Sequence, residues 1–253
     1  MTQDSIWAGI YDRFDQVPSG TGLFDTDLWT SKQKERAAAI LAGLQTKSVI
    51  PDAAKSRDYP LAAFLAPMLQ QKKNVYMLDY GGAMGQTYLD LLSKLPQAER
   101  RLQCRVVETP EVVATIPPEL SQLPGLSFAS SAEDYTADVL HCGSVLQYIE
   151  NWEAKLNELI AACDPSVIVL SDMLVGEIPT FVTAQHYGDR IIPVKFNNIE
   201  RFMAYWDKTP YELVYRSYFY PLPGDEYFAS HALPETHRLK KAAHFIFCKR
   251  KGE

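Results

Sequence analysis

The sequence lacks an excess of positive charge and any long hydrophobic run. Its 253 residues include 25 Lys or Arg and 31 Asp or Glu, which gives a formal net charge of -6. Nucleic-acid binding needs clustered basic side chains that neutralise phosphates, so nucleic acid is disfavoured as the main partner. No run approaches the roughly 20 apolar residues of a membrane-spanning helix, and no apolar leader opens the chain. We therefore expect a soluble, cytoplasmic protein with no nucleic-acid or membrane partner.

Cysteine is also scarce and dispersed. The four cysteines form no CxxC pair, and no His stands at zinc-ligand spacing from them; they are Cys104, Cys142, Cys163 and Cys248. Such isolated residues in mostly apolar surroundings are typical of reduced, buried thiols. The adjacent acidic pairs Glu133-Asp134 and Asp225-Glu226 have no nearby third ligand, so we predict no metal site.

Short apolar runs alternate with helix-like segments from residue 74 onward. The pattern predicts strands at 75–78, 104–107, 126–128, 139–142 and 166–170, with helices at 87–95 and 152–162. Strands that alternate with helices indicate a parallel sheet with crossover helices. Two later apolar runs, 213–220 and 242–248, are expected to pair antiparallel at one edge of that sheet.

The first 73 residues have a different character. Helical spacing of apolar residues predicts helices at 32–44 and 58–70, and no strand is evident before residue 74. We therefore predict two domains: an N-terminal helical cap, which is either a lid or a packing element, over 1–73, and an α/β domain over 74–253.

A glycine-rich loop follows the strand that begins at Val75. The strand leads into Asp79, and Gly81, Gly82, Ala83 and Gly85 come next. Glycines without a Cβ let the backbone approach a ligand closely, at the strand end where open α/β sheets bind ligands.

This loop departs from the dinucleotide pattern GxGxxG, because Ala83 and Gln86 stand where that pattern needs glycine. A carboxylate at Asp79 would not favour a phosphate, whereas it suits the ammonium of an amino acid. Both features favour S-adenosylmethionine, which carries an amino acid tail and a positive sulfonium and has no phosphate. The alternative is a tight turn that has only a structural role and binds no ligand.

Glu108 ends the next expected strand. A carboxylate there can accept hydrogen bonds from both hydroxyls of a ribose. Because NAD sites use the same device, Glu108 favours a nucleoside ligand without distinguishing between the two cofactors.

The sequence resembles the class I S-adenosylmethionine-dependent methyltransferases. It is more similar to a family of bacterial proteins, classed as methyltransferases by sequence, that share several motifs. Those motifs stand here as Trp7-Ala8-Gly9-Ile10-Tyr11, Leu78 to Gly85, Val106-Val107-Glu108, Ser144-Val145-Leu146-Gln147-Tyr148 and a Gln at Gln185. The resemblance implies S-adenosylmethionine as cofactor and a Rossmann-like core, with a mostly parallel seven-stranded sheet and an antiparallel edge strand.

The resemblance also suggests further cofactor contacts. In such enzymes a residue near the end of the third strand, often Asp, approaches the adenine amine; Ser131 stands near that position here, which is a departure from the family. Gly143, after the fourth strand, is placed for a backbone contact with the cofactor.

The acceptor side is less defined. Transfer to a hydroxyl needs a general base, and His186 and Asp172 are the candidates; a surface histidine and a solvated turn carboxylate are the alternatives. Tyr148 and Gln185 are expected to contact the acceptor, with packing as the alternative for Tyr148. Trp7 and Tyr11 would either cover it as a lid or simply pack.

We therefore predict a methyltransferase that acts on a small-molecule or glycan-like acceptor, with O-methylation favoured. An NAD-type enzyme and a non-catalytic S-adenosylmethionine-binding protein are the competing functions. Assembly as a homo-oligomer stays open.

Overall fold

The computed structural model describes residues 5–18, 24, 26–48, 50, 59–219 and 231–250. The chain forms two compact units. The first comprises residues 1–23, 144–157 and 170–253, and the second comprises 24–143 and 158–169. The predicted boundary between residues 73 and 74 stays a prediction, although the chain does not group into units at that point.

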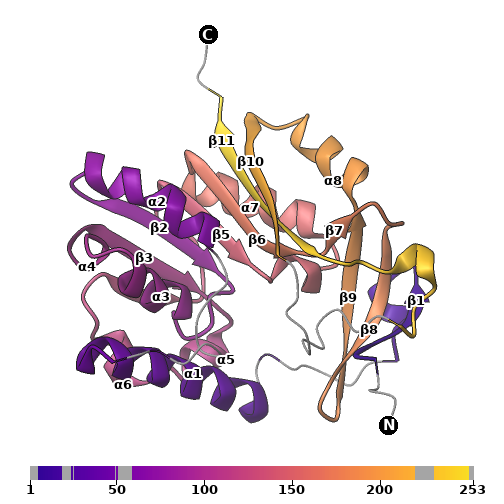
Figure 1. Cartoon of the computed structure of the whole chain (residues 1–253), viewed down its shortest axis with the longest axis horizontal. Coiled ribbons are helices and arrows are strands. Elements are labelled where there is room, and N and C mark those ends of the chain that lie inside the picture. Colours follow the sequence, from indigo (N-terminus) through magenta and orange to yellow (C-terminus); the bar gives the residue numbers. More distant parts are fainter. Residues whose placement is uncertain are drawn as a thin grey trace. The chain divides into compact units, whose positions relative to one another are not determined.

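The second unit is built on parallel strands. Strands β5 (Val139–Gly143), β2 (Val75–Tyr80), β3 (Leu102–Val107) and β4 (Leu126–Ala129) are neighbours in that order, and their pairings are parallel. Figure 1 shows β5, β2 and β3 side by side. Four of the six residues of β2 are buried, including the three consecutive residues Met77, Leu78 and Asp79, as expected of a strand whose two faces are both covered there.

Helices connect these parallel strands, as the sequence predicts. Helices α3 (Gln86–Lys94) and α4 (Ala98–Arg101) lie between β2 and β3, and the single-turn helices α5 (Pro110–Val113) and α6 (Pro118–Ser121) lie between β3 and β4. The longer helices α1 (Asp27–Thr46) and α2 (Tyr59–Gln71) precede β2. Residue 58, where helix α2 was expected to begin, lies outside the described residues. Helix α1 packs against α3, and the amide of Gln86 donates to the backbone and side-chain oxygens of Gln33 at 3.0 Å.

The complete sheet has seven strands in the order β10-β11-β6-β5-β2-β3-β4, with β6 at Val167–Met173. Strands β10 (Tyr211–Phe219) and β11 (Ala242–Lys249) are antiparallel, with Tyr211 opposite Lys249. The Rossmann-like fold with an antiparallel edge is therefore confirmed. Helix α7 (Trp152–Cys163) precedes β6.

The first unit holds a second, smaller sheet that the sequence reading missed. Its order is β1 (Trp7–Tyr11), β8 (Phe181–Tyr187), β9 (Arg190–Asn198) and β7 (Val175–Gly176). Figure 1 shows β1 beside the long β8–β9 hairpin. The expectation of no strand in the first 73 residues is wrong, because residues 7–11 pair antiparallel with β8.

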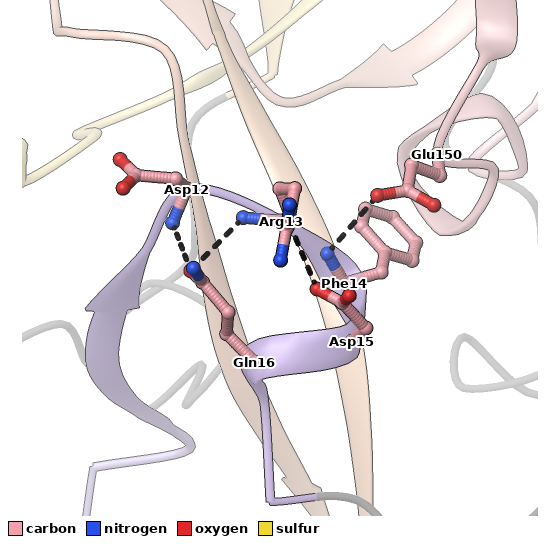
Figure 2. A network of polar contacts seen from close by, with 6 residues as sticks. All are labelled: Asp12, Arg13, Phe14, Asp15, Gln16 and Glu150. Carbon is pink, nitrogen blue, oxygen red and sulfur yellow. Dashed lines mark hydrogen bonds and ion pairs between the residues drawn. The ribbon is translucent and has the colours of Figure 1, made fainter.

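A short polar network follows β1 in the chain (Figure 2). The side-chain oxygen of Gln16 accepts hydrogen bonds from the backbone N–H groups of Asp12 at 2.9 Å and Arg13 at 3.3 Å. The backbone N–H of Phe14 donates to Glu150 Oε1 at 3.2 Å. These bonds satisfy backbone donors at a turn and tie it to a residue far along the chain.

The core of the first unit is rich in aromatic residues. Trp206, in helix α8 (Ile199–Trp206), stacks on Phe247 with ring centroids 3.6 Å apart. Trp7 meets Phe196 edge to face at 5.1 Å. Aromatic pairs of this kind add to the stability that their burial provides.

Candidate functional site

The loop after β2 is held in an unusual backbone conformation. Gly81, Ala83 and Gly85 have φ values of 71°, 52° and 78°. The N–H of Gly81 donates to the carbonyl of Val107 at 2.9 Å, and that of Gly85 donates to the carbonyl of Gly82 at 2.9 Å. Left-handed φ values suit glycine, so Ala83 is the position where the loop stores strain.

Glu108 fixes that strained position. Its Oε1 accepts a hydrogen bond from the backbone N–H of Ala83 at 2.8 Å, and Oε2 accepts from the N–H of Thr109 at 3.3 Å. Burial raises the pKa of Glu108 above 4.5, and the nearby charge of Asp79 adds to this, while the two backbone hydrogen bonds oppose it. The glycine-rich loop after β2 is therefore in contact with Glu108, which follows β3, as expected when β2 and β3 are parallel neighbours.

Asp79 is more deeply buried than a residue that contacts a ligand directly would be expected to be. Its carboxylate Oδ1 is 2.6 Å from Nδ1 of His141, and the two side chains are only 1% and 3% exposed. His141 belongs to β5, and this contact gives the buried imidazole a polar partner.

The remaining cofactor-side candidates also follow parallel strands. Ser131 comes after β4; it is exposed, and its hydroxyl accepts the backbone N–H of Glu133 at 3.1 Å. Gly143 ends β5. The candidates thus come from the carboxyl ends of four neighbouring strands, where open α/β sheets bind ligands.

On the first unit, Tyr148 and Gln185 are in contact. The Tyr148 hydroxyl donates to Gln185 Oε1 at 3.0 Å. Burial raises the pKa of Tyr148 well above its ordinary value of 10, and the charge of Asp172 adds to the rise. The phenol therefore stays protonated at neutral pH and acts as a hydrogen-bonding group.

Asp172 lies in a second polar group. Its backbone N–H donates to Nδ1 of His244 at 3.2 Å, and its φ is 55°. The buried amide of Gln147 donates to Ser144 Oγ at 2.9 Å, and Ser144 has a φ of 53°. Strained residues of this kind cluster at functional sites. His244 was not among the predicted site residues, and a lone His inside the apolar run 242–248 was the available signal. Ser144 begins one of the motifs that carry the resemblance.

His186 is not brought together with these groups. It is exposed, and it follows Gln185 in β8, so the two side chains point to opposite faces of the strand. The Gly188-Asp189 turn makes residues 181–198 a hairpin, and the exposed position of His186 on its first strand agrees with the surface-histidine alternative.

Trp7 and Tyr11 have different surroundings. Trp7 is 1% exposed and belongs to the cluster that includes Phe181 and Phe196, whereas Tyr11 is half-buried against a separate cluster with Val182 and Ala184. For Trp7 these contacts are those of a packing residue. Substrate contact by either residue stays a prediction.

Cys104, Cys142 and Cys163 are free and buried, as expected, while Cys248 is only half-buried. Within the described ranges, no three His, Cys, Asp or Glu side chains are grouped closely enough to hold a metal ion. In the same part of the chain, no helix combines the length and the hydropathy needed to cross a membrane.

Among known proteins, similar ones are found only by comparison of structures. No family model matches the sequence, and no curated protein matches it. Among solved structures, coclaurine N-methyltransferase bound to N-methylheliamine and SAH has a TM-score of 0.56 at 12% identity, covering 94% of this chain and 84% of its own. The 1,6-didemethyltoxoflavin-N1-methyltransferase of Burkholderia thailandensis, with bound 1,6-didemethyltoxoflavin and S-adenosylhomocysteine, has a TM-score of 0.51 at 13% identity, covering 96% of this chain and 100% of its own. At these identities the similarity establishes the fold.

Proposed function

We propose that this protein is an S-adenosylmethionine-dependent methyltransferase that acts on a small molecule. The observation that carries the proposal is the hydrogen bond of 2.8 Å between the Ala83 N–H and Glu108, which joins a left-handed, glycine-rich loop to an acid on the neighbouring strand. Proteins of similar fold that are crystallised with S-adenosylhomocysteine support the cofactor.

The chemistry of these groups fits the cofactor. Glu108 is half-buried, and its carboxylate would accept hydrogen bonds from the two ribose hydroxyls. The backbone of the loop Gly81–Gly85 would lie close to the amino acid tail. Ser131 would form a hydrogen bond with the adenine. Gly143 would offer its backbone at the end of β5. When bound, the cofactor supplies an electrophilic methyl group on a positive sulfonium.

The acceptor side rests on the polar groups of the first unit. The Tyr148–Gln185 pair and the Asp172 carboxylate would orient a hydrogen-bonding acceptor, which suits a small molecule or glycan with hydroxyl groups. We propose O-methylation, with Asp172 as the favoured base and His186 as the other candidate. Asp172 is favoured because His186 points away from the Gln185 face of β8.

Titration calorimetry with S-adenosylhomocysteine tests the cofactor half of the proposal. We expect saturable binding that weakens by about tenfold or more in Glu108→Ala, since each lost charge-assisted hydrogen bond is worth roughly 1.5–3 kcal/mol. Glu111→Ala is the matched control, because Glu111 is an exposed acid three residues further on. A folded wild-type protein that does not bind this ligand would rule the proposal out.

Turnover tests the acceptor half. Once an acceptor is found, Asp172→Asn should lower kcat far more than His186→Asn does, because a base acts on the reacting proton. Saturable cofactor binding without turnover on any hydroxyl-bearing panel would favour a non-catalytic binding protein.

A further inference from the structure

Two side chains of the central sheet form a buried pair below the glycine-rich loop. Asp79 of β2 and His141 of β5 are register partners on neighbouring parallel strands, so their side chains lie on the same face of the sheet. The carboxylate Oδ1 is 2.6 Å from the imidazole Nδ1. Asp79 Oδ2 is buried, and no described residue donates a hydrogen bond to it.

Two glycines rest directly on this pair. A Cβ added to Gly82 would lie 2.3 Å from Asp79 Oδ2, and one added to Gly143 would lie 2.9 Å from Cε1 of His141. Neither glycine has a left-handed φ, so space rather than backbone conformation demands glycine at both positions. One glycine belongs to the loop after β2 and the other ends β5, and both are cofactor-side candidates.

A buried carboxylate such as that of Asp79 needs a hydrogen-bond donor to compensate for the loss of water. Burial, and then the charge of Asp79, raise the pKa of the thiols of Cys104 and Cys142. Burial mainly, with a contribution from Asp79, also raises the pKa of Glu108. These neighbours are neutral or negative, so they cannot compensate a buried carboxylate, whereas the Nδ1–H of His141 can.

We propose that His141 is a positioning residue for the cofactor site, and that Asp79 acts by supporting the loop rather than by touching the cofactor's ammonium group. The inference rests on the proposed function. His141 holds the Asp79 carboxylate, and the carboxylate in turn sets how closely Gly82 lies to the sheet. The imidazole itself sets the position of Gly143.

Two ligands separate this role from direct contact. S-adenosylhomocysteine has the amino acid tail, while 5′-methylthioadenosine has the same nucleoside and lacks it. If the pair supports the loop, His141→Leu and Asp79→Ala weaken the binding of both ligands by similar factors, about tenfold or more, which is about 1.4 kcal/mol or more. His141→Asn, which keeps an N–H near the position of Nδ1, should restore most of the affinity.

Each other result has a definite meaning. If Asp79→Ala weakens S-adenosylhomocysteine alone, Asp79 contacts the ammonium and the inference is wrong. If His141→Leu binds both ligands as the wild type does, His141 has no positioning role. If the wild-type protein binds neither ligand, the proposed cofactor fails.

A second measurement uses the ligand-free protein and does not depend on the cofactor. Because the Gly82 Cβ would meet the Asp79 carboxylate, Gly82→Ala should lower the melting temperature by about 3 °C or more in the wild-type background. It should lower it much less in the Asp79→Ala background, where the obstructing oxygen is gone. Additive losses in this double-mutant cycle would show that Asp79 does not support the loop.

Discussion

Ala83 is the strained residue of the glycine-rich loop. It has a φ of 52°, yet it is not glycine, and its N–H is held by Glu108. A left-handed alanine costs roughly 1–2 kcal/mol, so a charge-assisted hydrogen bond at this point offsets a real strain. The same carboxylate is the proposed ribose ligand, which couples loop geometry to ligand binding.

The raised pKa of Glu108 predicts opposite effects of pH on stability and on affinity. Its pKa in the folded state lies above 4.5 because of burial, so the protonated form suits the ligand-free fold better. The stability of the wild type relative to Glu108→Gln should therefore fall as pH rises from 4.5 through the folded-state pKa. Urea unfolding of both proteins at several pH values measures this difference.

The affinity for S-adenosylhomocysteine should instead increase as pH rises. The ionised carboxylate accepts two ribose hydroxyls better than the protonated form, so S-adenosylhomocysteine should bind the wild type more tightly as pH rises through the same range. Glu108→Gln, which cannot ionise, should lack this dependence. Identical pH profiles for the two proteins would mean that Glu108 does not bind the ligand through its charge.

At the scale of elements, strand β1 holds the beginning of the described chain to the smaller sheet. Trp7 lies opposite Gln185 and Ala8 opposite Ala184, and Thr183 Oγ1 donates to the carbonyl of Gly9 at 2.8 Å. On the same strand Trp7 is buried and Ile10 is 42% exposed. The packing of Trp7 should therefore contribute far more to stability than the packing of Ile10.

Trp7→Ala should cost about 3–5 kcal/mol of unfolding free energy, as removal of a buried Trp typically does. Ile10→Ala, on the same strand, should change stability by less than about 1 kcal/mol, since Ile10 is 42% exposed whereas Trp7 is 1% exposed. Denaturant unfolding gives both values. If Trp7→Ala leaves stability intact and only weakens binding of an acceptor, Trp7 is a lid residue and not a packing residue.

At the scale of the whole molecule, the order of strands determines where a ligand can bind. The parallel neighbours β5, β2, β3 and β4 place the glycine-rich loop, Glu108, Ser131 and Gly143 at one end of the sheet. The fold alone is compatible with several nucleotide cofactors, because Rossmann-like sheets bind both dinucleotides and S-adenosylmethionine there. Selectivity must therefore be tested on the intact protein.

A thermal-shift comparison makes that test. S-adenosylhomocysteine at 100 times its Kd should stabilise the protein by about 2.7 kcal/mol and raise its melting temperature by several degrees. NADH at the same concentration should leave the melting temperature unchanged, because the loop lacks the GxGxxG pattern. Stabilisation by NADH alone would favour the oxidoreductase alternative.

The pattern of apolar runs and helices was enough to predict the central sheet and its antiparallel edge pair. Buried strands read as apolar runs, and the ends of parallel strands share one edge, so local patterns were sufficient for these features. The Gly188-Asp189 turn also stood in the sequence as a hairpin signal, with Gly188 at a φ of 61°, although the reading missed it.

Which distant side chains meet depends on the fold as a whole. Residues 7–11 carry no clear strand pattern alone, and they become β1 because β8, more than 170 residues away, offers an unpaired edge. The pairing of Asp79 with His141 depends on β2 and β5 being neighbours in register, which local periodicity does not encode. For the same reason, the sequence suggested a carboxylate for the ligand, while the fold placed that carboxylate beneath a glycine and beside an imidazole.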